Sequence, residues 1–96
     1  MNIYLNCIYT GAGARAMVEE LRSSGVQEAV WKEDGCLQYD YFLSAQREDQ
    51  VVLLEKWRDE EALAVHMKAP NMDRIVAIKD KHGVETEVRR LTLLEK

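Results

Sequence analysis

Two strand-forming stretches, residues 36–44 and 51–57, follow each other closely in the middle of the chain. Both are rich in β-branched, aromatic or aliphatic residues, and the polar segment 45–50 between them suits a hairpin loop. Strands joined by so short a loop pair antiparallel, whereas parallel strands need a longer crossover. The centre of the chain therefore predicts an antiparallel hairpin, around which the rest must be arranged.

Helical and strand patterns alternate on the N-terminal side of this hairpin. Residues 2–9 predict a strand that ends at Thr10-Gly11. The spacing of the next apolar residues predicts a helix. A shorter run at residues 26–30 continues the helical spacing until Asp34-Gly35 forces a turn. The residues that share the first helical face are Ala14, Met17, Val18 and Leu21.

The C-terminal side repeats this alternation. Asp59 is a natural N-cap with acidic residues in the turn after it, and Pro70 opposes continuation, so we expect a helix over residues 60–68. Asn71 is expected to cap a second helix that ends at Gly83. Residues 84–94 then predict the last strand.

The order β-α-β-β-α-β predicts an α+β, ferredoxin-like domain with an antiparallel sheet and helices on one face, formed by residues 1–96 as a single domain. Both faces of the hairpin strands carry apolar residues. Because soluble monomers seldom expose a large apolar patch, we expect a homodimer packed sheet to sheet. Leu37, Tyr39, Tyr41 and Leu43 are expected on the dimer side of their strand, with Cys36 and Phe42 on the other.

Charge and composition exclude several classes of partner. The 13 basic and 17 acidic residues give a net charge of −4 and are interspersed, which disfavours nucleic acid and anionic membranes as partners. No apolar run approaches the roughly 20 residues of a membrane span, and no signal-peptide core is present. The chain has two cysteines and shows no secretory features, which favours reduced thiols and a cytoplasmic location. His66 and His82 form no paired spacing with them, so no metal site is expected.

Two segments could carry chemistry. Residues 11–16 match the G-x-G-x-x-A dinucleotide fingerprint, but no parallel strands flank them, so we interpret them as a glycine-rich turn. His66 shares a helical stripe with the small residues Ala62 and Ala69, which leave room for a planar ligand. It is a candidate general base for an acidic phenol, the alternative being a half-buried structural histidine.

Three further side chains stand out on the strands. Asn6 places an amide on an otherwise apolar strand, where it needs a hydrogen-bond partner such as a ligand oxygen or a neighbouring protein group. Trp57 suits a ligand-facing wall or core packing equally well. Tyr39 and Tyr41 suit packing at an interface or contact with a substrate.

The run Glu55-x-Trp57-x-Asp59-x-x-Ala62-Leu63-x-x-His66, preceded by Gly35-Cys36-Leu37-x-Tyr39, resembles the antibiotic biosynthesis monooxygenase family, including its small quinol monooxygenase-like members. The likeness extends over residues 3–93. It implies a dimeric α+β barrel whose pockets lie between helices and sheet. Family members often carry a second histidine after the proline, where this chain has Asn71. Haem-degrading relatives match at Asn6 and Trp57 but use a histidine that the helix after Pro70 lacks.

Together these observations predict a monooxygenase without metal, flavin or other cofactor, which oxidises an electron-rich phenolic or hydroquinone-type aromatic with O₂. His66 would take the proton, Asn6 would orient an oxygen atom, and Trp57 would form the ring-facing wall. A non-catalytic dimeric module that binds a small molecule, and a relative that binds or degrades haem, remain as alternatives. The residues expected to contact the substrate are Tyr39, Tyr41, Met67 and Asn71.

Overall fold

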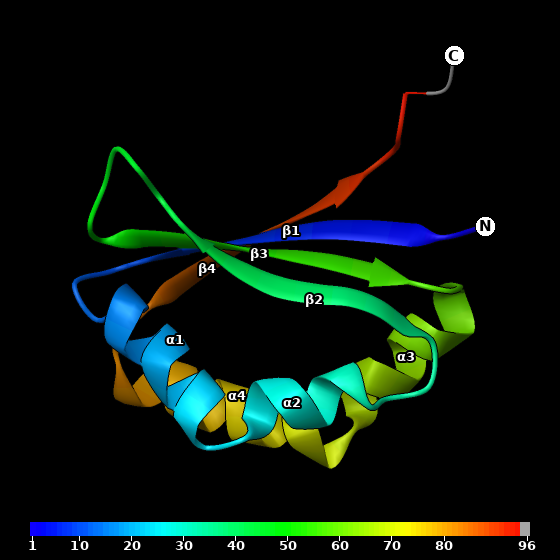
Figure 1. Ribbon diagram of the computed structural model, residues 1–96, viewed down its shortest axis with the longest axis horizontal. Helices are drawn as coiled ribbons and strands as arrows, with labels where there is room; N and C mark the ends of the chain where they lie inside the picture. The colour runs from blue at the N-terminus through cyan, green and yellow to red at the C-terminus, as the bar shows by residue number, and fades with distance from the viewer. Residues whose placement is uncertain (95–96) are drawn as a thin grey trace.

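The computed structural model describes residues 1–94 and confirms the predicted α+β, ferredoxin-like fold. The elements in chain order are β1 (Ile3–Thr10), α1 (Ala14–Ser23), α2 (Val26–Trp31), β2 (Cys36–Leu43), β3 (Gln50–Trp57), α3 (Glu60–Lys68), α4 (Pro70–Lys81) and β4 (Glu85–Leu91). The strands form one antiparallel sheet in the order β2-β3-β1-β4, and all the described helices lie against the same face of it (Figure 1).

The two C-terminal helices begin for different reasons. The side chain of Asp59 accepts a hydrogen bond of 2.8 Å from the backbone N–H of Ala62, so α3 begins with the predicted cap. The predicted cap for α4 is wrong, because that helix begins at Pro70 with Ala69 as its N-cap. Proline fits the first helical position, where a backbone N–H would have no helical acceptor. Asn71 is left free for a contact with another element.

The core lies between the helices and one face of the sheet, here called the covered face. Alternate residues of the two central strands point into it, and the predicted face of α1 packs over them. Those strand residues are Ile3, Leu5, Cys7 and Tyr9 on β1 and Val51, Leu53, Glu55 and Trp57 on β3. On these two strands the covered face thus carries one carboxylate, Glu55, among apolar and aromatic residues.

No described helix lies on the other face of the sheet, here called the open face (Figure 1). Ile8, Val52 and Leu54 meet there across β1 and β3 and are only half-buried. Phe42 of β2, opposite Val52, is 49% exposed. The open face therefore has the apolar character that motivates the prediction of a sheet-to-sheet homodimer.

Strand β2 departs from the predicted alternation. A register irregularity between Cys36 and Gln38 pairs Cys36 with Trp57 and Tyr39 with Glu55. One extra residue in a bulge reverses the facing of everything before it. Cys36, Tyr39 and Tyr41 consequently share the covered face, and the predicted placement of the two tyrosines on the dimer side is wrong. Tyr39 is only 2% exposed.

The glycine-rich turn after β1 packs against the end of α4. A Cβ atom at Gly13 would collide with the backbone of His82, and one at Gly11 would crowd the carbonyl oxygen of Gly83. These close approaches explain why glycine is needed at both positions and support the interpretation as a structural turn. Among residues 1–94, no helix combines the length and the hydropathy needed to span a bilayer.

Candidate functional site

His66, on α3, packs against the covered face with its side chain completely buried. Its ring stacks on Trp57, with the ring centroids 4.5 Å apart and the planes 29° apart. The Tyr39 ring packs edge-to-face against the imidazole, with the two ring centroids 5.7 Å apart. The structure thus brings together the predicted residues of α3, β3 and β2 around one imidazole.

Two carboxylates flank this imidazole. His66 Nδ1 lies 2.8 Å from Glu33 Oε1, and because an ionised carboxylate only accepts, Nδ1 donates this bond. The second oxygen of Glu33 accepts a hydrogen bond of 2.9 Å from Asn71 Nδ2. On the other side, His66 Nε2 lies 4.0 Å from Glu55 Oε1 and has no hydrogen-bond partner within the described chain. The imidazole is therefore oriented from one side and unsatisfied on the other.

Glu55 is held by two donors. Oε1 accepts a bond of 2.9 Å from Trp57 Nε1, and Oε2 accepts a bond of 3.0 Å from Cys7 Sγ. Burial, reinforced by the charge of Glu55 and this bond, raises the pKa of the Cys7 thiol far above its ordinary value. Cys7 therefore stays protonated as a donor to Glu55, which excludes it as a thiolate nucleophile.

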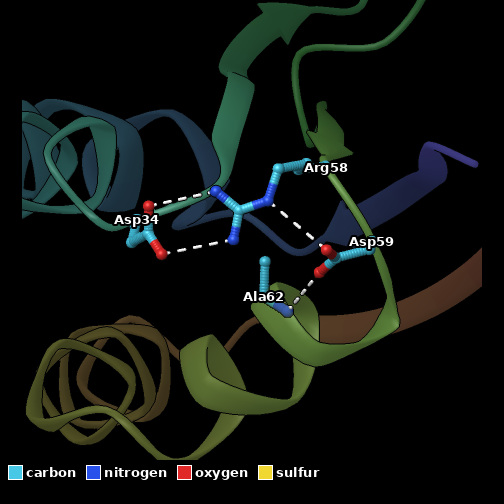
Figure 2. Close-up of polar contacts among 4 residues, drawn as sticks. All are labelled: Asp34, Arg58, Asp59 and Ala62. Atoms are coloured by element: carbon cyan, nitrogen blue, oxygen red, sulfur yellow. Dashed lines mark hydrogen bonds and ion pairs between the residues drawn. The ribbon is translucent and has the colours of Figure 1, made fainter.

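A polar clamp of Asp34, Arg58 and Asp59 ties the loop before β2 to the start of α3 (Figure 2). The Arg58 guanidinium donates to both oxygens of Asp34, at 3.1 and 3.2 Å, and to Asp59 at 3.3 Å. These bonds to Arg58 lower the pKa of Asp34, and the cap bond to Ala62 lowers that of Asp59. The clamp ties the loop that carries Glu33 to the start of the helix that carries His66.

Close backbone packing reinforces the clamp. Gly35 has a positive φ of 83°, and its carbonyl oxygen accepts a bond of 2.8 Å from the Arg58 backbone N–H. A Cβ atom at Gly35 would collide with Ala62, so only glycine allows the loop to approach α3 this closely. The short distance between Glu33 and His66 thus follows from a glycine two residues after Glu33 and from the cap of the helix that carries His66.

A groove of about 470 Å³ opens beside this cluster, between α3, α4 and the covered face. Glu55 and Cys7 reach it from the sheet, whereas His66 and Trp57 do not line it. Lys79 and Arg90 lie among its polar lining residues. The apolar and aromatic residues that line it are Leu5, Tyr9, Tyr39, Leu63, Met67, Met72, Ile75, Val76 and Val88. Glu55 is therefore the carboxylate that the groove and the buried imidazole share.

The predicted site residues fall into three groups. Trp57 and His66 are in contact, with Tyr39 beside them and Tyr41 a further 5.9 Å from Tyr39, measured between ring centroids. Met67 lines the groove, and Asn71 acts only through Glu33. Asn6 lies on the open face, across the sheet from His66. The three residues predicted to carry the reaction, Asn6, Trp57 and His66, therefore do not converge on one cavity. Its buried Oδ1 has no partner among residues 1–94.

Sequence reasoning assigned no role to Glu33 or Glu55. Glu55 did carry a signal, since it is a carboxylate at an inward position of the strand that contains Leu53 and Trp57. Glu33 carried none, because it stands in a polar turn where a charged residue is ordinary. Among residues 1–94, no three His, Cys, Asp or Glu side chains are grouped so as to hold a metal ion.

Comparison with known proteins gives a family model and several structures. Residues 2–78 match the family model described as antibiotic biosynthesis monooxygenase. A Bacteroides thetaiotaomicron protein of unknown function, described as a possible oxidoreductase, is 26% identical with a TM-score of 0.81, and the match covers 94% of this chain and 95% of that one. No curated protein sequence matches this chain.

Two more distant structures share the fold. An antibiotic biosynthesis monooxygenase candidate from Deinococcus radiodurans is 20% identical with a TM-score of 0.79, over 100% of this chain and 95% of that one. SnoaB, a cofactor-independent oxygenase from Streptomyces nogalater, is 14% identical with a TM-score of 0.83, over 99% and 95% of the two chains. At these identities the likeness shows the fold alone.

Proposed function

Because the chain belongs to the antibiotic biosynthesis monooxygenase family, we propose that it is a monooxygenase that oxidises an electron-rich phenol or hydroquinone with O₂ and uses neither metal nor flavin. The observation that carries the proposal is the groove of about 470 Å³, apolar along its helices and provided with one buried carboxylate on its floor. Its volume lies in the range of small-molecule sites, which combine apolar walls with few polar groups.

The proposed reaction needs a base more than it needs a cofactor. Deprotonation of a phenol or an anthrone-like ring makes the ring reducing enough to pass an electron to O₂. In an anthrone-like ring a CH₂ is then converted to C=O, and in a hydroquinone a ring C–H becomes C–OH while the ring is oxidised to the quinone. In both cases one oxygen atom of O₂ enters the product and the other leaves as water. The substrate loses four electrons and O₂ gains four, so no external reductant is consumed. The largely apolar lining of the groove favours this step by limiting the water around the reactive intermediates.

His66 supplies the basic group in this proposal. Glu33 fixes its tautomer, and the stacked ring of Trp57 stabilises the imidazolium that forms on protonation. Trp57 thereby acts on His66 from within the core. Met67 and Tyr39 contact the substrate along the groove.

The test is oxygen uptake by metal-free, flavin-free protein with hydroquinones and anthrone-like phenols, corrected for their autoxidation. We expect uptake above background, reduced at least about tenfold in His66→Gln, which corresponds to loss of general base catalysis. His82→Gln is the matched control, because His82 lies outside the groove and should keep the wild-type rate. Binding of these aromatics without any uptake would assign the protein to non-catalytic binding modules instead.

We also propose that the protein works as a homodimer, with the open faces of two copies packed together. The apolar residues of that face, which include Ile8, Val52 and Leu54, support this arrangement, as does the unsatisfied amide oxygen of Asn6. Sedimentation at micromolar concentration should give twice the mass of the 11.1 kDa chain. A monomer under these conditions would overturn the dimer and leave the proposed chemistry in place.

A further inference from the structure

We propose that Glu55 takes the proton directly from a phenolic ligand and passes it to the buried pair of His66 and Glu33, which stores it. This inference deepens the proposed function and rests on it. It assigns to a residue of the strand, and not to the histidine, the contact with the ligand's hydroxyl group.

Access to the groove separates the two candidate bases. Glu55 lines the groove, although it is only 6% exposed, whereas His66 is fully buried and does not line it. A hydroxyl group in the groove can therefore form a hydrogen bond with Glu55, whereas His66 does not line the groove. Proton transfer requires hydrogen-bond contact or a single relay, and Glu55 provides that relay.

The unsatisfied nitrogen of His66 faces this carboxylate. Since Nδ1 donates to Glu33, the neutral imidazole carries its lone pair on Nε2, which has no hydrogen-bond partner in the described chain. Nε2 lies 4.0 Å from Glu55 Oε1, about 1 Å beyond a hydrogen bond. A proton on Glu55 would give this buried acceptor its missing donor, so protonation draws the two groups together.

The transfer balances without any change of oxidation state. The phenolic O–H bond breaks as an O–H bond forms on Glu55, and that bond in turn breaks as an N–H bond forms on His66 Nε2. The phenol becomes a phenolate, and the imidazole becomes an imidazolium between Glu33 and Glu55. Glu55 returns to its ionised state, and, before the next ligand is deprotonated, the proton stored on His66 leaves through Glu55 to the ligand or to the water formed.

The groups that face this relay favour it. Trp57 Nε1 and Cys7 Sγ each donate to one oxygen of Glu55, so the carboxylate is aligned before a ligand arrives. Trp57 also presents its ring to the imidazole. Burial raises the pKa values of Cys7, Tyr9, Tyr39 and Tyr41, so these neighbours stay neutral and do not compete for the proton. Beyond His66, the other charged groups near the relay are Glu33, whose side chain is 14% exposed, and Lys79 and Arg90, which line the groove and whose positive charges favour the phenolate.

The experiment uses nitrophenols as probes, because their ionised form absorbs visible light and they are poor reductants. In the wild-type protein we expect the bound probe to ionise at least about one pH unit below the free probe, a tenfold shift of its equilibrium. Glu55→Gln keeps the shape of the side chain but cannot accept the proton, so the shift should vanish. Glu20→Gln is the matched control, a glutamate also paired with a histidine but outside the groove, and should keep the wild-type shift.

Oxygen uptake by the same variants separates the two proposals. Loss of both the ionisation shift and the uptake in Glu55→Gln supports both. A shift and an uptake that survive in Glu55→Gln overturn the relay, while the oxygenase proposal stands. If wild-type protein takes up no oxygen but loses its ionisation shift in Glu55→Gln, the relay stands and the oxygenase proposal fails. Absence of any shift for a bound probe in the wild type, or failure of every nitrophenol to bind, overturns the relay outright.

Discussion

Two histidine–glutamate pairs in this molecule have the same hydrogen-bond length and different surroundings. His66 and Glu33 are joined at 2.8 Å in the core, with side-chain exposures of 0% and 14%. His82 and Glu20 are also joined at 2.8 Å, at the end of α4, with exposures of 18% and 30%. The hydrogen-bond distance alone therefore does not distinguish a functional site from a surface contact, because the dielectric of the surroundings sets the interaction energy of the pair.

The second contacts of each pair show why. Glu20 Oε1 also accepts from Lys81 Nζ at 2.9 Å, so the surface pair belongs to a small cluster of charges that water and salt can screen. Glu33 instead uses its other oxygen for Asn71, and the far nitrogen of His66 faces a second carboxylate. Solvent can replace any member of the surface cluster, whereas nothing replaces a missing member in the core.

Truncating the two histidines should give the largest difference. His66→Ala leaves a cavity beside Trp57 and removes the partner of buried Glu33, so we expect the free energy of unfolding to fall by about 3 kcal/mol. His82→Ala should have an effect several times smaller, because water takes its place beside Glu20. Urea denaturation at neutral pH measures both. Equal losses for the two variants would show that burial does not separate the pairs.

The fold was more predictable than the site because its signals are local. Asp59 and the acidic turn after it mark the start of α3 whatever surrounds it, and the spacing of Ala14 and Leu21 marks the buried face of α1. Asn71 was misassigned as a cap because an amide beside a proline looks the same in sequence whether it caps a helix or bonds to Glu33. Local pattern cannot distinguish these, since the competing partner comes from a distant loop.

The core of the site depends on contacts that no local pattern encodes. The bulge in β2 brings Cys36 and Tyr39 onto the same face of the sheet, and a one-residue change of register has no marker in an apolar strand. Glu33 reaches His66 only because Gly35 packs on Ala62 and Arg58 binds Asp34. His66 and Trp57, by contrast, were singled out from the sequence itself, His66 by its stripe of small helical residues, and the resemblance to family members supported both choices with long-range information that spacing lacks.

Removing the cap of α3 should weaken the buried pair from outside, with an intermediate effect. Asp59→Ala deletes the acceptor for the Ala62 N–H and one arm of the Arg58 clamp, so we expect the melting temperature to fall by several degrees. Glu61→Ala, in the same helical turn, is the matched control and should change it much less. A loss in Glu61→Ala as large as that in Asp59→Ala would mean that first-turn charge, and not the cap, holds α3 in place.

The surface pair should produce the smallest effect, visible only through its dependence on pH. Hydrogen bonds from Lys81 and then His82 lower the pKa of Glu20 in the folded protein, so the unfolded chain binds more protons in the acidic range. The stabilisation is therefore complete above the ordinary carboxylate pKa and is lost as the pH falls through the lower folded value. Urea midpoints of wild type and Glu20→Gln should differ slightly at neutral pH, converge in strong acid, and differ less at high salt. A difference that persists unchanged in acid and at high salt would mean that Glu20 stabilises through packing, and the contrast with the buried pair would then rest on His66 and Glu33 alone.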